Sequence, residues 1–267
     1  MEKSAAESFA RAVELMTHLR GPQGCPWDRE QTFDSIKPYT LEETYEVFDA
    51  IERRAWSDLR GELGDLLLQV LFYAQMAQDE GHFSIGEVIE ELNAKLVRRH
   101  PHVFGEEASD TAGEVIRTWD KVKQQEKAAS GTATGGLLDD IPRTMPALME
   151  AVKIGSRASK IGFDWSRAEE LFDKLAEEEH ELRAEIEAPS PQQELIAEEF
   201  GDLLFVAVNL ARHLEVSPED ALRAANAKFR RRFAAMERFA GSTEALRQMP
   251  VEKMEELWTQ AKQEERA

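Results

Sequence analysis

Two short acidic phrases recur in the chain, each at the edge of a strongly apolar segment. Residues 62–68 read ELGDLLL and residues 199–205 read EFGDLLF, so each phrase places an aspartate three positions after a glutamate. On a helix, residues three apart lie on one face. A carboxylate beside a hydrophobic core is costly unless a partner compensates for it. The phrases therefore indicate a site that gathers cations.

A second acidic pattern, Glu-Glu-x-x-Glu, lies upstream of each phrase. If the two acidic helices pack together, their four carboxylates repel one another, which raises pKa values or requires cations. Oxygen ligands alone suit Mg²⁺ or Mn²⁺, and the missing Glu-x-x-His spacing disfavours a di-iron site. The converging acids are Glu43, Glu46, Glu62 and Asp65 in one set and Glu178, Glu181, Glu199 and Asp202 in the other. The alternative is a solvated acidic face, with Arg53, Arg54 and Arg60 as salt-bridge partners for one set.

Basic and aromatic residues follow each acidic set in a fixed order. Lysine and arginine suit phosphate oxygens by charge and donor geometry. A tryptophan four positions before a lysine stacks on a base or packs in a core. These residues are Lys95, Arg98, Arg99, Trp119 and Lys123 in the first half and Lys228, Arg231, Arg232, Trp258 and Lys262 in the second. A surface stripe that pairs with the acidic excess is the alternative for the basic residues.

The elements that must position these residues are helices. Nearly every long segment has helical periodicity, and alternating β-branched runs are absent. We expect helices at 4–20, 39–55, 57–80, 84–99, 111–128, 143–160, 166–187, 191–214, 217–240 and 250–265. Each half also ends in a Trp-x-x-x-Lys-Gln-x-Glu pattern, so four patterns recur in one order, which indicates a duplicated all-α domain. We predict domains at 1–127 and 141–267 and a linker at 128–140.

Composition limits the classes of function. The 267 residues include 52 acidic and 33 basic side chains, for a net charge of −19, which argues against a general binder of nucleic acid or anionic membrane. The single cysteine, Cys25, excludes an intramolecular disulfide and a cysteine-based zinc site. The N-terminus lacks the apolar core of a signal peptide, and no apolar run is long enough to span a membrane. We expect a cytoplasmic protein.

With these residues assembled, the sequence resembles the two-domain form of the MazG family of nucleoside triphosphate pyrophosphohydrolases. The similarity covers nearly the whole chain, and its longer phrases are specific to that family. The first half carries CPWDREQTF, YTLEETYEV, LRGELGDLLLQVLFYAQMA and RRHPHVF. The second half carries KIGFDW, EEFGDLLF, VNLARHL and NAKFRRRF. All-α dUTP and phosphoribosyl-ATP pyrophosphohydrolases share only the two acidic patterns, more loosely.

The resemblance implies Mg²⁺-dependent cleavage of a nucleoside triphosphate to a monophosphate and pyrophosphate, with Mn²⁺ as a substitute. It assigns both acidic sets as metal ligands and implies a homodimer whose helices complete four-helix bundles. Lys228, Arg232, Trp258 and Lys262 match its nucleotide contacts, and we add Arg231 and Lys174. Leu195 stands where some members carry a lysine. Because the second half has the fuller nucleotide set, we expect it to carry most of the activity.

Two alternatives compete with a broad pyrophosphohydrolase that cleans or regulates the nucleotide pool. One is a non-catalytic helical regulator or scaffold that binds a nucleotide. The other is a narrower enzyme that resembles a dUTPase. The sequence does not identify the physiological nucleotide, the catalytic base, the number of metal ions or a regulatory protein partner.

Overall fold

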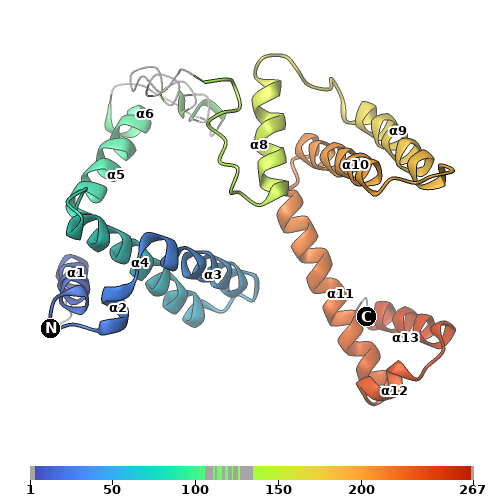
Figure 1. Ribbon diagram of the computed structural model, residues 1–267, viewed down its shortest axis with the longest axis horizontal. Coiled ribbons are helices and arrows are strands. Elements are labelled where there is room, and N and C mark those ends of the chain that lie inside the picture. Colours follow the sequence, from blue (N-terminus) through green and yellow to red (C-terminus); the bar gives the residue numbers. More distant parts are fainter. Residues whose placement is uncertain are drawn as a thin grey trace. The chain divides into compact units, whose positions relative to one another are not determined.

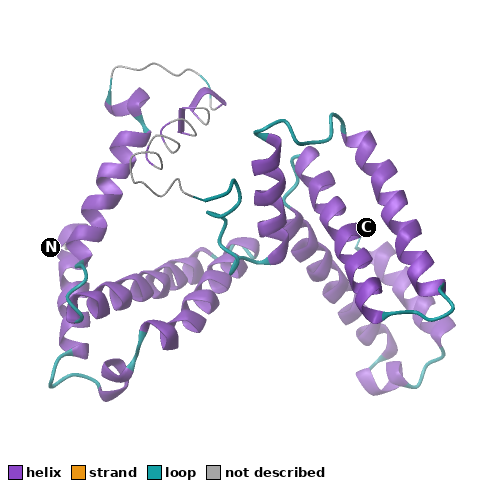
Figure 2. Ribbon diagram, turned by 45° about the horizontal axis from the view of Figure 1, so that its top comes forward, coloured by secondary structure: helices purple, strands orange, loops and turns teal. Residues whose placement is uncertain are grey.

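The computed structural model describes residues 4–105, 111, 113–115, 118, 119, 122, 126 and 135–265. Within these residues the regular elements are helices and no strand occurs, which confirms the expected all-α class (Figures 1 and 2). The helices of these ranges are each too short or too polar to cross a bilayer. The chain divides into two compact units, Met1–Gly131 and Thr132–Ala267. The predicted linker falls partly outside the described residues, so our domain limits stay predictions.

The first unit is built around one long helix. Its described helices are α1 (Ala5–Arg20), α2 (Pro26–Glu30), α3 (Phe33–Glu52), α4 (Trp56–Asp79), α5 (Ile85–Arg99) and α6 (Pro101–Phe104). Helix α4 packs along α3 and also contacts α1 and α5. A core forms where α1, α3 and α4 meet, from Met16, Ile36, Leu71, Phe72 and Met76. This packing fixes α4, which carries the ELGDLLL phrase, against α3.

Helix α3 begins six residues earlier than we predicted, at Phe33 instead of residue 39. The Thr32 hydroxyl accepts a hydrogen bond from the Ser35 N–H at 3.2 Å, and the Ser35 hydroxyl accepts one from the Thr32 N–H at 2.9 Å. This reciprocal cap starts the helix ahead of Pro38. Pro38 then lies inside α3, where its missing N–H leaves the Asp34 carbonyl without an intrahelical donor.

The second unit contains two helix groups. Its helices are α8 (Ala147–Ser159), α9 (Ala168–Glu187), α10 (Gln193–His213), α11 (Pro218–Ala240), α12 (Thr243–Arg247) and α13 (Val251–Glu264). Helices α9 and α10 form a hairpin, with α8 against α10 (Figure 1). Helix α11 packs against α12 and α13 around Ala235, Met236, Leu246, Leu257 and Ala261. The hairpin carries the acidic residues, and the α11–α13 pair carries the basic and aromatic ones.

A polar network fastens the segment before α9 to α10. Asp164 accepts hydrogen bonds from Nη1 and Nη2 of Arg212 and lies 3.0 Å from Nε2 of His213. Arg212 also donates from Nε to Oδ1 of the fully buried Asn209 at 3.1 Å. A Cβ at Gly155 of α8 would lie 2.2 Å from that Oδ1, so this close approach requires glycine. Chiefly through its bonds with Arg212, the pKa of Asp164 falls from 3.8 to about 2.

Candidate active site

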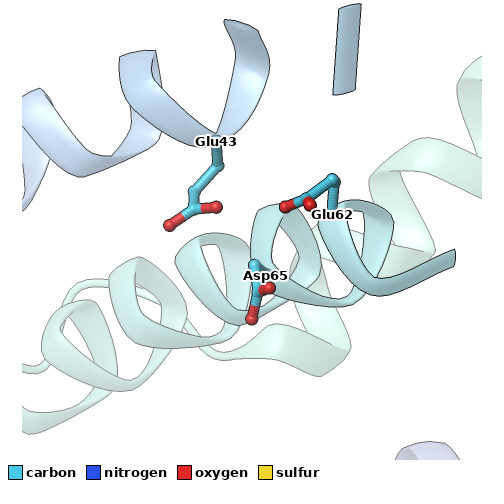
Figure 3. Close-up of side chains that lie close together, drawn as sticks. All are labelled: Glu43, Glu62 and Asp65. Carbon is cyan, nitrogen blue, oxygen red and sulfur yellow. The ribbon is translucent and has the colours of Figure 1, made fainter. Parts of the chain in front are cut away.

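The first acidic cluster lies between α3 and α4. Glu43 extends from α3 towards Glu62 and Asp65 of α4 (Figure 3). Each residue offers a carboxylate oxygen within 4.8 Å of those of the other two. The sequence therefore predicted correctly that acids 19 to 22 positions apart would meet, because α3 and α4 pack along each other. Glu46 is not part of this tight group.

Electrostatics in the first cluster favour neutralisation of its charge. Burial raises the pKa of Glu43, and the carboxylates of Asp65, Glu46 and Glu62 raise it further. The pKa of Glu62 is also raised, first by burial and then by the neighbouring Glu46 and Asp65. Glu46 thus interacts with Glu62 although it lies outside the tight group. A bound cation would relieve this repulsion.

The second cluster repeats the arrangement between α9 and α10. Glu178, Glu199 and Asp202 bring carboxylate oxygens within 4.8 Å of one another. Burial, followed by the charges of Glu181, Asp202 and Glu178, raises the pKa of Glu199. Glu181 is therefore the counterpart of Glu46, close to its cluster but outside the tight group. Both acidic sets occupy corresponding places in the two halves.

Glu178 distinguishes the second cluster from the first. It is only 4% exposed, whereas Glu43 is half-buried. Lys174, one turn earlier on α9, lies 2.7 Å from Oε1 of Glu178 and 2.8 Å from Oε1 of Glu177. These two contacts, led by the hydrogen bond to Glu177, raise the pKa of Lys174. The corresponding residue of the first half, four positions before Glu43, is Tyr39, which offers no charge.

The residues present fit a hard divalent cation. Among the described residues, Oε2 of Glu178 is buried and has no hydrogen-bond partner. An unpaired buried carboxylate oxygen is costly, and a cation that also contacts Glu199 and Asp202 would satisfy it. The donors of this cluster are carboxylate oxygens, the ligands that Mg²⁺, Ca²⁺ and Mn²⁺ prefer. The geometry therefore supports metal binding without selecting the ion.

The predicted nucleotide contacts of the second half lie on α11 and α13. The guanidinium carbon of Arg232 lies 5.8 Å from the centroid of the Trp258 ring. Trp258 also packs against Phe229, with ring centroids 5.1 Å apart. Lys228 is exposed and Lys262 is half-buried on the same pair of helices. The structure thus gathers Arg232 and Trp258 and places both lysines on the two helices that carry them.

The tandem arginines have a partner that we did not predict. Both Arg231 and Arg232 donate to Glu265, which follows α13, at 2.8 and 2.7 Å. Glu265 and its counterpart Glu126 close the Trp-x-x-x-Lys-Gln-x-Glu pattern, so the repeat marked both glutamates. Nothing in the sequence paired them with arginines about thirty positions away, because that contact depends on how the helices pack.

The first half shows a related arrangement of its basic residues. Arg98 and Arg99 both contact Glu126, each at 2.6 Å. Their hydrogen bonds, led by that of Arg99, lower the pKa of Glu126 to about 2. Trp119 and His100 pack edge to face, with ring centroids 5.0 Å apart. The residue of the second half that corresponds to His100 is Phe233. Lys95 is half-buried, and the predicted contact Lys123 lies outside the described residues.

Comparisons with known proteins match both halves. A sequence profile described as the MazG nucleotide pyrophosphohydrolase domain matches residues 31–104 and 167–235, which include every carboxylate of both acidic sets. A protein of Escherichia coli named nucleoside triphosphate pyrophosphohydrolase is 49% identical over 257 residues, covering 96% of this chain and 97% of its own. A Thermotoga maritima protein named nucleoside triphosphate pyrophosphohydrolase/pyrophosphatase MazG is 45% identical, covering 97% of this chain and 98% of its own. A Mycolicibacterium smegmatis protein, also named nucleoside triphosphate pyrophosphohydrolase, is 44% identical over 60% of this chain.

Proposed function

The chain belongs to the MazG family of nucleotide pyrophosphohydrolases, and from this premise we propose that its second half holds Mg²⁺ and carries most of the turnover. It is a nucleoside triphosphate pyrophosphohydrolase, as its full-length relatives are named. The observation that carries the choice of half is the buried, unpartnered Oε2 of Glu178. The first cluster offers no equivalent among the described residues.

The carboxylates of the second half are the proposed ligands. Glu178, Glu199 and Asp202 hold the ion, and Glu181 joins them from the same face of α9. Mg²⁺ is the proposed ion, with Mn²⁺ as a substitute, because both accept oxygen ligands and share their shells with phosphates. When bound, such an ion neutralises charge on the triphosphate and on the leaving pyrophosphate. The protein's own contribution is to fix these ligands on two packed helices.

Basic and aromatic residues of the second half are the proposed substrate contacts. The cationic ones suit the triphosphate, because charge-assisted hydrogen bonds to phosphate are strong. They are Lys174, Lys228, Arg231, Arg232 and Lys262. Trp258 offers a ring face to the base, and stacking tolerates any base. We therefore propose broad base specificity and a role in clearing or regulating nucleotide pools.

We further propose that the chain works as a homodimer in the cytoplasm. Large apolar side chains are exposed on the hairpin of α9 and α10. Phe172 of α9 is 57% exposed and Phe200 of α10 is 50% exposed. Apolar surface of this kind commonly marks a protein interface. A second hairpin from another copy would cover these residues and complete a four-helix bundle.

Single substitutions in the two clusters test which half turns over. We expect Glu199→Ala to reduce pyrophosphate release by roughly 100-fold or more, because a metal ligand supports several kcal/mol of charge stabilisation. Glu62→Ala should keep most of the activity. The assay is steady-state pyrophosphate release from each of the common ribo- and deoxyribonucleoside triphosphates with Mg²⁺.

The same assay includes outcomes that contradict the proposal. A larger loss in Glu62→Ala than in Glu199→Ala would assign turnover to the first half. Activity on deoxyuridine triphosphate alone would replace broad specificity with a dUTPase-like one. Circular dichroism of both variants controls for folding.

A further inference from the structure

In each half, a single glutamate joins two consecutive arginines of a long helix. Glu265 accepts from Arg231 through Oε1 and from Arg232 through Oε2. Glu126 likewise accepts from both Arg98 and Arg99, although Arg99 reaches both of its oxygens and also donates from Nη2. The same bridge therefore forms twice, from residues 27 to 34 positions apart. Ion pairs that form by chance would not be expected to join the corresponding residues of both halves.

The two arginines that Glu265 joins are not equivalent. Arg231 uses both Nε and Nη2 on Oε1 of Glu265, and its side chain is 63% exposed. Arg232 donates only from Nε, at 2.7 Å, and its side chain is 18% exposed. Across the described part of the chain, neither terminal nitrogen of Arg232 has a hydrogen-bond acceptor. The guanidinium of Arg232 is therefore held through Nε, and its two Nη atoms remain available for a ligand.

Two contacts fix the orientation of the Arg232 guanidinium. Glu265 holds Nε, while the ring of Trp258 lies 5.8 Å from the guanidinium carbon. A planar guanidinium recognises phosphate through two parallel N–H groups, so its orientation decides whether it can bind in this way. An arginine already held in place also loses less side-chain entropy when the ligand binds. The two contacts thus restrict the directions in which the terminal nitrogens of Arg232 can point.

We propose that Glu265 is a positioning residue, which holds Arg232 so that its terminal nitrogens meet the triphosphate. This inference rests on the proposed role of Arg232 as a substrate contact. Glu265 carries negative charge, so its bare electrostatic effect on a triphosphate is repulsive. Positioning and repulsion predict opposite signs when the carboxylate is removed. A raised KM would therefore indicate that Glu265 orients Arg232, and a lowered KM would indicate that Glu265 repels the triphosphate.

Removal of the Glu265 carboxylate tests the proposal. We expect Glu265→Ala to raise KM for a nucleoside triphosphate about 3- to 10-fold, the effect of losing one partly exposed charge-assisted contact. The value of kcat should change little, because the hydrogen bonds of Glu265 join it to Arg231 and Arg232 and not to the carboxylate cluster, and the loss of a uniform binding contact changes KM without changing kcat. The measurement is steady-state pyrophosphate release by the full chain with Mg²⁺.

Glu264→Ala is the matched control. Glu264 precedes Glu265 directly and accepts from Arg238 on both oxygens at 3.0 Å, so its removal deletes an ion pair between the same two helices. KM should be unchanged in this variant, and thermal melts should show similar stability for both. An unchanged KM in Glu265→Ala would overturn the positioning role. A lowered KM would also overturn it, and would show that the main effect of the carboxylate is to repel the triphosphate.

A double-mutant cycle separates failure of this inference from failure of the proposed function. The cycle is run in an Arg231→Ala background, where Arg232 is the remaining arginine that Glu265 holds. There Arg232→Ala should raise KM, and Glu265→Ala should add nothing to Arg232→Ala, because both then act through one guanidinium. An additive increase in the double variant would contradict positioning through Arg232. An unchanged KM in Arg232→Ala would instead contradict the proposed substrate contact itself.

Discussion

Glu178 has one carboxylate oxygen on Lys174 and the other buried without a partner among the described residues. Its neighbour Glu199 has a pKa raised by burial and by four nearby carboxylates. A carboxyl group whose folded pKa is raised stabilises the fold only below its ordinary pKa, and that contribution is lost as pH rises through the folded value. At neutral pH the metal-free cluster therefore opposes folding, and a bound cation reverses this effect.

The repulsion among these carboxylates predicts that a bound cation stabilises the protein. Mg²⁺ should raise the melting temperature of the protein at pH 7, and a concentration 100 times Kd corresponds to about 2.7 kcal/mol. Glu199→Gln should abolish most of that increase and also melt above the metal-free wild type, since it removes a repelling charge. Differential scanning calorimetry with Mg²⁺ and with a chelator measures both effects.

Glu187→Gln provides the control for this experiment, because Glu187 is an exposed acid at the end of the same helix, α9. It should respond to Mg²⁺ as the wild type does. Equal responses of the wild type and Glu199→Gln would refute the assignment of Glu199 as a ligand.

At the scale of elements, the acidic hairpin depends on the segment that leads into it. Asp164 precedes α9 and binds Arg212 and His213 near the end of α10. Because this network ties the start of one acidic helix to the end of the other, it sets their register. Loss of the carboxylate should weaken the second unit without touching the metal ligands.

Asp164→Asn tests this role. The pKa of Asp164 is lowered to about 2, so its stabilisation is complete above the unfolded pKa near 4 and disappears as pH falls towards 2. We expect a loss of about 1–2 kcal/mol at pH 7, an estimate reduced because the side chain is 22% exposed. Urea unfolding followed by circular dichroism from pH 7 to 3 measures the difference, which should shrink with acidity. Asp173→Asn, an exposed change on α9, should show no such dependence.

Helical periodicity predicted most elements of the site to within two residues, including α4, α10, α11 and α13. It misplaced the start of α3, which we expected at residue 39, because the cap at Thr32 starts the helix upstream of Pro38. The acidic clusters were predictable because spacing on one helix and pairing of neighbouring helices are local properties. The bridge between Arg232 and Glu265 was not, since it depends on the contact of α11 with α13.

For the molecule as a whole, the apolar surface of the hairpin predicts association of two copies. Leu204 of α10 is 46% exposed and lies one turn from Phe200. The double change Phe200→Asp and Leu204→Asp should convert a dimer to a monomer and lower activity, since charge on an apolar interface opposes burial. Light scattering after size-exclusion chromatography measures the mass. The wild type should elute at twice the chain mass of 30.3 kDa.

Val251→Asp on α13 is the matched control, because Val251 is also exposed, at 65%, but lies away from the acidic hairpin. It should leave the mass unchanged. A monomeric wild type, or a dimer that survives both aspartates, would exclude this face as the interface.

The duplication was visible in the sequence because four patterns recur in order, and the matches over both halves confirm it. What the repeat did not reveal is how far the halves differ. Lys174 pairs with Glu178 in the second half. The residue of the first half that corresponds to Lys174 is Tyr39, which cannot form such a pair. Such differences lie in single residues outside the shared patterns.

Pro38 adds a mechanical difference between the two acidic sites. It removes one backbone bond from α3 about a turn and a half before Glu43, whereas α9 has no proline and runs unbroken into Glu178. A helix bends most easily where its ladder is interrupted. The acidic residues that α3 contributes to the first cluster therefore follow an interrupted stretch of helix, whereas those that α9 contributes to the second follow an unbroken one. The two clusters thus differ in the stiffness of one supporting helix even where their side chains are the same.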